Sequence, residues 1–400
     1  MNAIVLDGEL KSALATVRSL GRAGISVCAC AERASAMALH SKYANKTFVY
    51  PSPYTNQKGF VESVKKASVT CGGKPLVYAF SDATYLTFFA HREELSKVAT
   101  LVFPEEKSIG IAFDKASTYS LAHIYQVPTI TTYDPERGDE IDRLAQKLSY
   151  PAVMKKRHSV TWHNGMGVYG TTVFVHSSKE LKETISTIKK ETGENPLVQE
   201  FVLGEEYGVE MMADQGVVRA VVVHHRIRSL SPTGGASVVK ETLGESELVS
   251  TMRAHAEKLV SALSWHGPIM VEFKVDSDTR EPLLMEINGR FWGSLPLAIA
   301  AGVDMPLLFH ELAGGRLAQG EVITAREGVT TRHFLGDALN LIRVLIARDR
   351  MRPITYPTRM KALRDFFTTP LTTRGDIWSR DDIKPSMMEY VDIIRKKLNS

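Results

Sequence analysis

Two acidic side chains and one amide fall on the same side of an expected β-hairpin. Glu272 sits between apolar residues in one strand, and Glu286 and Asn288 alternate with apolar residues in the returning strand. Because successive side chains on a strand point to opposite faces, a turn near residues 276–280 brings Glu272 opposite Glu286. Carboxylate and amide oxygens are ligands that Mg²⁺ prefers, so the pattern indicates a magnesium site.

The same hairpin has a simpler interpretation as a polar, solvent-facing sheet surface that binds no metal. Short acidic alternations are common in half-buried hairpins, and here Met285 and Ile287 are expected to face the core. Two facing carboxylates repel each other, and a divalent cation between them removes that cost. The hairpin alone leaves both interpretations open.

Three basic residues alternate on an earlier strand. His224, Arg226 and Arg228 occupy every second position and therefore share one face. A tight loop with Gly234 and Gly235 follows, and this combination suits the recognition of an anion. The alternative is a network of ion pairs between the arginines and nearby glutamates.

A further arginine follows the acidic hairpin. Arg290 lies two residues beyond Asn288, on the face of the expected metal ligands if the strand continues that far. A guanidinium at that place can form two hydrogen bonds with a substrate carboxylate. The neighbouring Trp292 is better explained by core packing than by substrate contact.

Several segments, taken in order, resemble one protein family. Val271-Glu272-Phe273 and Glu286-Ile287-Asn288-Gly289-Arg290 resemble the metal-binding signature of the ATP-grasp ligases. Three earlier segments resemble further landmarks of that family in the family's order: Phe113-Asp114-Lys115 with Val127-Pro128-Thr129, Tyr150-Pro151-Ala152-Val153-Met154-Lys155, and residues 197–207. The matching landmarks span roughly residues 113 to 310.

The resemblance implies how ATP binds. Lys115 and Lys155 contact its phosphates, the backbone of Glu200 and Val202 bonds the adenine edge, and Glu206 bonds the ribose hydroxyls. This set is physically coherent, because phosphoryl transfer needs cations around the phosphates and an apolar slot for the base.

The resemblance also implies a metal and a catalytic set. Mg²⁺, or Mn²⁺ in its place, is held by Glu272, Glu286 and Asn288. The strand that carries Arg226 and Arg228, with the Gly234-Gly235 loop after it, is most like that of one branch of the family. This branch contains the carboxylate-amine ligases related to D-aspartate ligase and to carbamoyl-phosphate-synthase-like proteins. In that branch the implied catalytic residues are Arg226, Arg228 and Arg290, and the implied substrate-site residues are Gly234 and Gly235.

The implied reaction joins a small-molecule carboxylate to an amine and forms a C–N bond. ATP phosphorylates the carboxylate, because a free carboxylate is a poor electrophile, and the amine displaces phosphate from the acyl phosphate in a water-poor site. Two alternatives stay open: a regulatory nucleotide-binding protein without turnover, and an ATP-grasp enzyme that makes another product from an acyl phosphate.

The loop of residues 156–170 sits where the family has its mobile phosphate lid. Three spaced glycines allow such a lid, and Arg157, His158 or His163 is a candidate for contacting phosphate. A plain hairpin loop is the alternative.

An α/β domain of residues 1–112 is expected to precede these segments. Strands at 4–6, 25–31, 76–80 and 98–103 alternate with helices, which is typical of a doubly wound parallel sheet. The first strand lacks a Gly-x-Gly-x-x-Gly turn, so the domain is not expected to bind a dinucleotide.

Residues 113–320 are expected to form an α+β grasp module. The small lobe covers about 113–200 and the large lobe about 201–320, with hairpins at 208–228 and 269–288 around a helix at 247–264. Residues 321–400 are expected to form a helical C-terminal extension. The whole chain therefore combines α/β and α+β architecture.

The charge of the 400-residue chain is close to balanced, with a net charge of +4. Residues 321–400 hold 15 Lys and Arg against 10 Asp and Glu, so the excess lies in the extension. A solvated helical face is favoured there over a surface for nucleic acid or anionic lipid, because the charges are interleaved in sign.

The three cysteines, Cys28, Cys30 and Cys71, are expected to be free thiols in a reducing compartment, with the first two on one face of a strand. We expect neither a signal peptide, because no basic region precedes the short apolar run at the N-terminus, nor a membrane span. We therefore expect a cytoplasmic enzyme that binds no nucleic acid and forms a homodimer if it self-associates.

Overall fold

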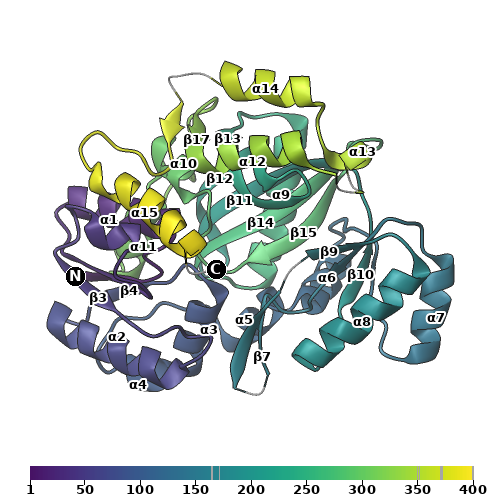
Figure 1. The fold of residues 1–400 in the computed structure, drawn as a ribbon. Helices are drawn as coiled ribbons and strands as arrows, with labels where there is room; N and C mark the ends of the chain where they lie inside the picture. Colours follow the sequence, from purple (N-terminus) through teal and green to yellow (C-terminus); the bar gives the residue numbers. More distant parts are fainter. Residues whose placement is uncertain (164, 171, 349, 351, 370–372, 399–400) are drawn as a thin grey trace.

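The computed structural model describes residues 1–163, 165–170, 172–348, 350, 352–369 and 373–398. Figure 1 shows an N-terminal domain, a large central sheet and a small lobe, with the C-terminal helices returning over the large sheet to the N-terminal domain. Residue 164 of the expected lid loop and residue 171, directly after that loop, lie outside the described residues.

The N-terminal domain contains a four-stranded parallel sheet, which confirms the predicted architecture. The strand order is β3-β2-β1-β4, and the strands are β1 (Ala3–Val5), β2 (Val27–Ala31), β3 (Lys46–Val49) and β4 (Leu76–Tyr78). The helices are α1 (Lys11–Arg22), the 3₁₀ helix η1 (Met37–His40), α2 (Gln57–Cys71), α3 (Asp82–Ala90), α4 (Arg92–Leu95) and α5 (Glu106–Ala112).

Two details of this domain differ from the prediction. Residues 98–103 form no strand, and only an isolated bridge joins Thr100 to Leu76. The edge strand β3 was not predicted, because its Lys46, Thr47 and Val49 are exposed and give no buried alternation.

The cysteine prediction is wrong for two of the three thiols. Cys28 and Cys71 form a disulfide, and only Cys30 is free and buried. Cys28 faces the layer that α2 covers, and Cys71 is the last residue of that helix, so their Cα atoms lie 6.4 Å apart. This separation lies within the range that a disulfide spans.

The small lobe contains an antiparallel sheet and two helices. The sheet order is β5-β10-β6-β9, with β5 (Thr132–Tyr133), β6 (Ala152–Lys155), β9 (Thr172–Val175) and β10 (Leu197–Glu200). Helices α7 (Gly138–Lys147) and α8 (Ser178–Thr192) cover it, and β7 (Val160–His163) and β8 (Met166–Tyr169) form a separate hairpin.

The large sheet forms the centre of the molecule. Its order is β15-β14-β11-β12-β13-β17-β18, and β16 pairs with β12. The strands are β11 (Gly204–Asp214), β12 (Val217–Ser231), β13 (Gly234–Thr242), β14 (Gly267–Asp276), β15 (Pro282–Asn288), β16 (Ile323–Thr324), β17 (Thr330–Arg332) and β18 (Arg374–Gly375). The helices of this part are α6 (Lys115–Ile124), α9 (Glu247–Ala262), α10 (Leu295–Ala300) and α11 (Met305–Ala313).

The extension is helical, as predicted, and also supplies β16, β17 and β18 to the large sheet. Its helices are α12 (Phe334–Ile346), α13 (Arg352–Thr355), α14 (Arg359–Thr368) and α15 (Lys384–Leu398). None of the described helices is long and apolar enough to cross a lipid bilayer.

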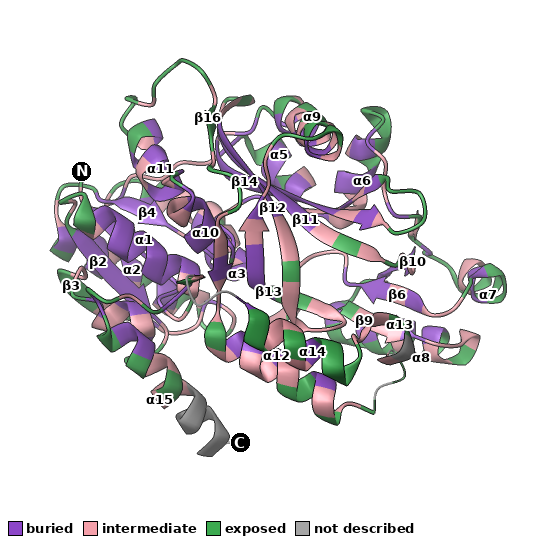
Figure 2. Cartoon of the chain, turned by 90° about the horizontal axis from the view of Figure 1, so that it is seen from above, coloured by how far each residue is buried: buried purple, intermediate pink, exposed green. Residues whose placement is uncertain are grey.

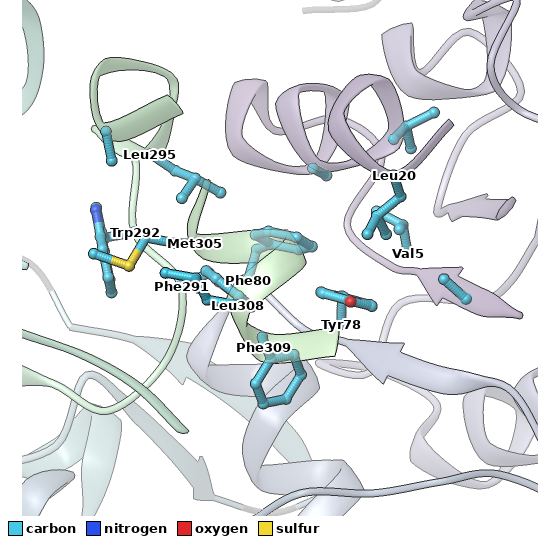
Figure 3. Close-up of a cluster of buried hydrophobic side chains, with 14 of the residues drawn as sticks. Val5, Leu20, Tyr78, Phe80, Phe291, Trp292, Leu295, Met305, Leu308 and Phe309 are labelled. Carbon is cyan, nitrogen blue, oxygen red and sulfur yellow. The ribbon is translucent and has the colours of Figure 1, made fainter. Parts of the chain in front are cut away.

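One hydrophobic core joins the N-terminal domain to the large lobe. Figure 3 shows side chains from both parts in a single cluster: Val5, Leu20, Tyr78 and Phe80 with Phe291, Trp292, Leu295, Met305, Leu308 and Phe309. The Phe291 ring stacks on Tyr78 and Phe80, with centroids 5.9 and 5.5 Å away. Each such buried aromatic contributes about 1.5–3 kcal/mol, so these parts are held together as one body.

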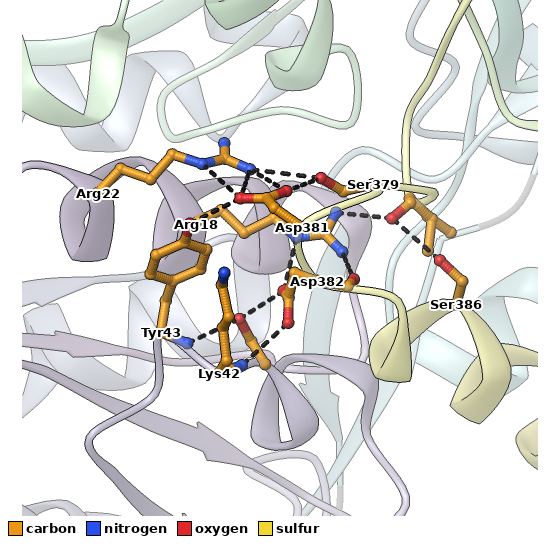
Figure 4. A network of polar contacts seen from close by, with 10 residues as sticks. Arg18, Arg22, Lys42, Tyr43, Ser379, Asp381, Asp382 and Ser386 are labelled. Carbon is orange, nitrogen blue, oxygen red and sulfur yellow. Dashed lines mark hydrogen bonds and ion pairs between the residues drawn. The ribbon is translucent and has the colours of Figure 1, made fainter.

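Buried ion pairs tie the extension to the same body (Figure 4). Arg18 on α1 donates to Oδ2 of Asp382 at 2.8 Å and to the carbonyl oxygens of Ile377 and Asp382. Asp376 accepts from Lys11 at 2.6 Å and from the buried Lys240 at 2.7 Å. Burial lowers the pKa of Lys240 to about 7, although Asp376 opposes that shift.

Candidate active site

The β14–β15 hairpin has the predicted register. Glu272 lies opposite Glu286, and the ladder shifts directly after Glu272. This bulge adds one residue to β15, so Leu284 is fully buried while Met285 is only half-buried. The prediction that Met285 faces the core is therefore wrong.

Charged groups from three strands meet on one face of the large sheet. In the strand register, Glu206 on β11 lies opposite Arg226 on β12. Gly208 on β11 lies opposite His224 on β12 on one side and opposite Glu272 on β14 on the other. A Cβ atom at position 208 would lie 2.3 Å from Cε1 of His224, so a glycine is needed there. Figure 2 shows mostly buried residues along β11 and β14 in the middle of this sheet.

The three predicted metal ligands lie together. Asn288 donates through Nδ2 to Oε1 of Glu272 at 3.0 Å and lies 3.5 Å from Oε1 of Glu286. Burial raises the pKa of Glu272, and the charge of Glu286 adds to that rise while Arg226 opposes it. No group of three or more His, Cys, Asp and Glu among the described residues is arranged to hold a metal. The candidate set is thus two carboxylates and one amide, and such oxygen donors fit Mg²⁺.

Arg226 connects the expected ribose residue with the expected metal ligand. Its Nη1 donates to Oε2 of Glu206 at 2.6 Å, and its Nη2 donates to Oε2 of Glu272 at 2.9 Å. Nη1 also donates to the carbonyl of Gly235 at 3.2 Å. Burial opposes ionisation of Glu206, but the charges of Arg226 and Lys274 outweigh it and lower its pKa.

Arg228 lies apart from this cluster. It donates to both carboxylate oxygens of Asp337 on α12, at 2.7 and 2.9 Å, and to Thr369 at 2.6 Å. It is therefore engaged in an ion pair with the extension, as in the alternative interpretation. Gly234 and Gly235, in the turn beside it, have φ values of 122° and 101°, which favour glycine.

The two lysines approach the site from different elements. Lys115 begins α6, and its Nζ donates to Ser159 at 3.1 Å and lies 3.9 Å from Oε2 of Glu286. Lys155 ends β6 in the small lobe and is buried, and its charge helps to lower the pKa of Glu206. Both predicted phosphate contacts therefore lie near the acidic cluster.

The expected adenine hinge connects the small lobe to β11. Glu200 ends β10, and its side chain accepts a hydrogen bond from the Tyr133 hydroxyl at 3.1 Å. Val202 lies in the short connection between β10 and β11 and is half-buried.

The expected lid forms the hairpin β7–β8. Of the three candidate residues, Arg157 makes two 2.9 Å hydrogen bonds to Asp114, and His158 contacts the carbonyl of Phe113 at 3.2 Å. His163 ends β7 and is half-buried. Near the same turn of the hairpin, Gly167 on β8 donates its N–H to the carbonyl of Tyr54 at 2.7 Å, so the lid touches the N-terminal domain.

Arg290 connects the hairpin to the N-terminal domain. Its Nε donates to Asp82, its Nη1 donates to the carbonyl of Phe291 at 2.9 Å, and its Nη2 donates to Oδ1 of Asn288 at 3.2 Å. Burial opposes ionisation of Asp82, but the charge of Arg290 outweighs it and lowers the pKa of Asp82.

The sequence analysis missed Asp82, although a signal was present. Asp82 follows β4, which neighbours β1 where the strand order reverses, and side chains beyond such strand ends face the crevice of an α/β sheet. Asp7 follows β1 at the same place and accepts from the N–H groups of Phe80 and Ser81, at 2.8 and 3.0 Å.

Glu210 was missed as well. It is fully buried on β11, accepts from the Ser294 hydroxyl, and lies 3.2 Å from Nδ1 of His224. Burial raises the pKa of Glu210 to about 8 and lowers that of His224 well below its usual value. Strand alternation places Glu210 on the charged face of the large sheet. The apolar residues on both sides of it in the sequence hid that signal.

Comparisons of the sequence with known proteins give matches of two kinds. Residues 192–335 match the family described as ATP-grasp in the biosynthetic pathway with Ter operon. The large chain of carbamoyl phosphate synthase from Pyrococcus furiosus is 25% identical over 257 residues, which cover 63% of this chain and 23% of that protein. The chain therefore matches less than a quarter of that relative's length.

This chain is similar to ATP-grasp proteins over residues 192–335.

Two solved structures share the fold over most of the chain. The L-amino acid ligase from Bacillus licheniformis aligns with a TM-score of 0.59 and 18% identity, over 78% of this chain and 74% of that one. The biotin carboxylase domain of 2-oxoglutarate carboxylase from Hydrogenobacter thermophilus, solved with MgADP and bicarbonate, aligns with a TM-score of 0.64 and 15% identity. That alignment covers 82% of this chain and 73% of the other.

Proposed function

We propose that this ATP-grasp protein is an ATP- and Mg²⁺-dependent ligase that joins a carboxylate to an amine through an acyl phosphate. The observation that carries the proposal is the cluster of Glu272, Glu286, Asn288 and Arg290 within one hydrogen-bond network, with Lys115 3.9 Å from Glu286. Two acids, an amide and two cations in one place suit the handling of phosphate and carboxylate oxygens.

In this proposal the small lobe and the hinge hold the nucleotide. Lys155 and Lys115 bind phosphate oxygens from opposite sides, the backbone at Glu200 and Val202 bonds the adenine edge, and Glu206 faces the ribose. Glu272, Glu286 and Asn288 hold Mg²⁺, which when bound neutralises charge on the phosphate oxygens.

The remaining cations act on the acid substrate. Arg290 orients the carboxylate by paired hydrogen bonds and stabilises the acyl phosphate that forms when the carboxylate oxygen takes the γ-phosphoryl group. Arg226 keeps Glu272 in place through its 2.9 Å hydrogen bond. The amine then attacks the acyl carbon, phosphate leaves, and the amide remains.

The proposal also draws on the relatives. A solved neighbour is named an L-amino acid ligase, and another was solved with MgADP and bicarbonate. These names support an ATP-using ligase with small-molecule substrates, and amino acids are the first carboxylates to test.

The experiment measures ADP release with Mg·ATP and a panel of amino acids and other small carboxylates, each paired with amines. We expect release that needs both an acid and an amine, and a decrease of about 100-fold or more in Glu286→Gln and Arg290→Ala. Glu241→Gln is the matched control, because Glu241 lies on the same sheet but contacts His225 at 3.6 Å. ATP binding without turnover for every pair would instead favour a regulatory nucleotide-binding protein.

A further inference from the structure

Helix α12 of the extension turns its polar side toward the protein. Asp337 is fully buried against Arg228 and Arg332, and Asn340 donates to the carbonyl of Ser229 at 2.8 Å. On the opposite side, Leu335, Leu339, Ile342 and Ile346 recur at helical spacing. Ile342 and Ile346 are 49% and 71% exposed, which is the reverse of an ordinary surface helix.

Helix α14 packs beside α12 and carries exposed apolar side chains of its own. Its inner side packs through Ala362 and Phe366, and the Phe366 ring lies 6.0 Å from that of Phe334 on α12. Its outer side presents Met360 and Phe367, seven residues apart, and these are 77% and 75% exposed. Figure 2 shows α12 and α14 side by side at one edge of the molecule, with exposed residues along both.

Basic residues surround these apolar side chains. Residues 341–369 contain seven Lys and Arg against two Asp, a net charge of +5, so the remainder of the chain carries −1. The exposed members of this set are Arg343, Arg348, Arg350, Arg359, Lys361 and Arg364. Of these, Arg350 pairs with Glu180 at 2.6 Å and Arg364 with Asp365 at 3.1 Å, so part of this charge is offset within the protein. The segment nevertheless combines an excess of positive charge with large exposed apolar side chains.

Exposed apolar side chains and positive charge together restrict which partner could cover this patch, by which we mean the exposed side chains of α12 and α14. A second copy of the chain would bring two patches of net charge +5 together, and like charges facing each other disfavour such a dimer. A nucleic acid would match the charge but would leave isoleucine, methionine and phenylalanine uncovered. An anionic lipid bilayer satisfies both, because lipid headgroups pair with the cations while apolar side chains enter the acyl boundary.

We propose that α12–α14 form a peripheral binding surface for anionic membranes. Met360 and Phe367 enter the interface, Ile342 and Ile346 follow, and Arg359, Lys361 and Arg364 contact lipid phosphates. The surface lies on the outer side of the extension, whereas the candidate active site lies on the large sheet near α6 and β15 (Figure 1). The inference is independent of the proposed ligase activity.

The test is co-sedimentation of the full chain with vesicles of phosphatidylcholine alone and with about 30 mol% phosphatidylserine. We expect binding to the anionic vesicles only, and weaker binding as salt screens the charges. The double variant Met360→Ser/Phe367→Ser and the charge variant Arg359→Glu/Lys361→Glu are each expected to weaken binding by about tenfold or more.

Matched controls change similar residues elsewhere. Ile124→Ser, at a residue 72% exposed at the end of α6, and Lys189→Glu/Lys190→Glu, on the exposed side of α8, are expected to leave vesicle binding unchanged. All variants alter exposed side chains, and equal melting temperatures verify that they fold.

Three results would overturn the proposal. The first is no binding to anionic vesicles, or binding that neither α14 variant weakens. The second is binding to a DNA or RNA oligonucleotide that exceeds binding to vesicles and is unaffected by Met360→Ser/Phe367→Ser. The third is a dimer in sedimentation velocity that the same double variant dissociates, because the patch is then an interface between two copies.

Discussion

The small lobe and the rest of the molecule are built in different ways, although both contribute residues to the candidate site. The small lobe, residues 131–200, encloses its own core of residues such as Leu144, Met154, Leu181, Ile185 and Val198. The N-terminal domain and the large sheet share a core, and the extension is joined to them by buried ion pairs. We call this second part the body.

The comparison shows how the site is divided. The expected small lobe of residues 113–200 splits between two cores, because Tyr119, Ala122 and Val127 pack on the large sheet. Lys115 therefore belongs to the body together with Glu272, Glu286 and Arg290, whereas Lys155 and Glu200 belong to the lobe. Independent packing would allow the lobe to close over a nucleotide while the groups proposed to bind the acid stay fixed.

The largest predicted effect comes from breaking the shared core. Phe291→Ala removes a ring that contacts side chains from both parts, and we expect the free energy of unfolding to fall by about 3–5 kcal/mol. Urea unfolding followed by circular dichroism measures the loss. If the N-terminal domain and the large sheet are one body, hydrogen exchange rises in β1 and β11 together, and a rise in only one of them would contradict the comparison.

A matched change in the lobe should act locally. Leu181→Ala opens the core under α8, and we expect a local destabilisation of about 2–4 kcal/mol. Hydrogen exchange with mass spectrometry is expected to show faster exchange in β6, β9 and β10 and unchanged exchange in β1–β4. Equal acceleration in the body would mean that the lobe is not an independent unit.

A smaller effect is expected in the pH dependence of the free energy of unfolding of the body. The pKa of Glu210 is raised from an ordinary value near 4.5 to about 8, so the folded state holds a proton that the unfolded state has lost. Stability from this group is present below pH 4.5 and is lost as pH rises through 8, by roughly 1 kcal/mol per pH unit. Urea unfolding over this range is expected to give a shallower slope in Glu210→Gln than in the wild type, and equal slopes would contradict the assignment.

Much of the fold was predictable from local patterns. Alternation fixed the hairpins at 208–228 and 269–288, because their turns carry Asp214-Gln215-Gly216 and Asp276 to Arg280 between clear apolar runs. The edge strand β3 was not predicted, because it lacks buried alternation. The disulfide of Cys28 with Cys71 was not predicted either, because it depends on how α2 packs on β2.

The site was predictable where its residues share a strand or a hairpin. Glu272, Glu286 and Asn288 were placed by register alone, whereas Asp82 reaches Arg290 from the start of α3, 208 residues earlier in the chain. Arg228 shows the opposite case, since alternation put it with Arg226 but Asp337 of the extension engages it. Contacts between distant segments set these two outcomes, and no local pattern encodes them.

The central claim is that Glu272, Glu286 and Asn288 of the body hold the metal that a bound nucleotide requires. Isothermal titration of ADP into the wild type, Glu286→Gln and the control Glu241→Gln, each with Mg²⁺ and with EDTA, tests it most directly. We predict that Mg²⁺ tightens ADP binding in the wild type and in Glu241→Gln, and that Glu286→Gln still binds ADP but gains about tenfold less from Mg²⁺. The same gain from Mg²⁺ in all three proteins, or no binding of ADP by the wild type, would contradict the account.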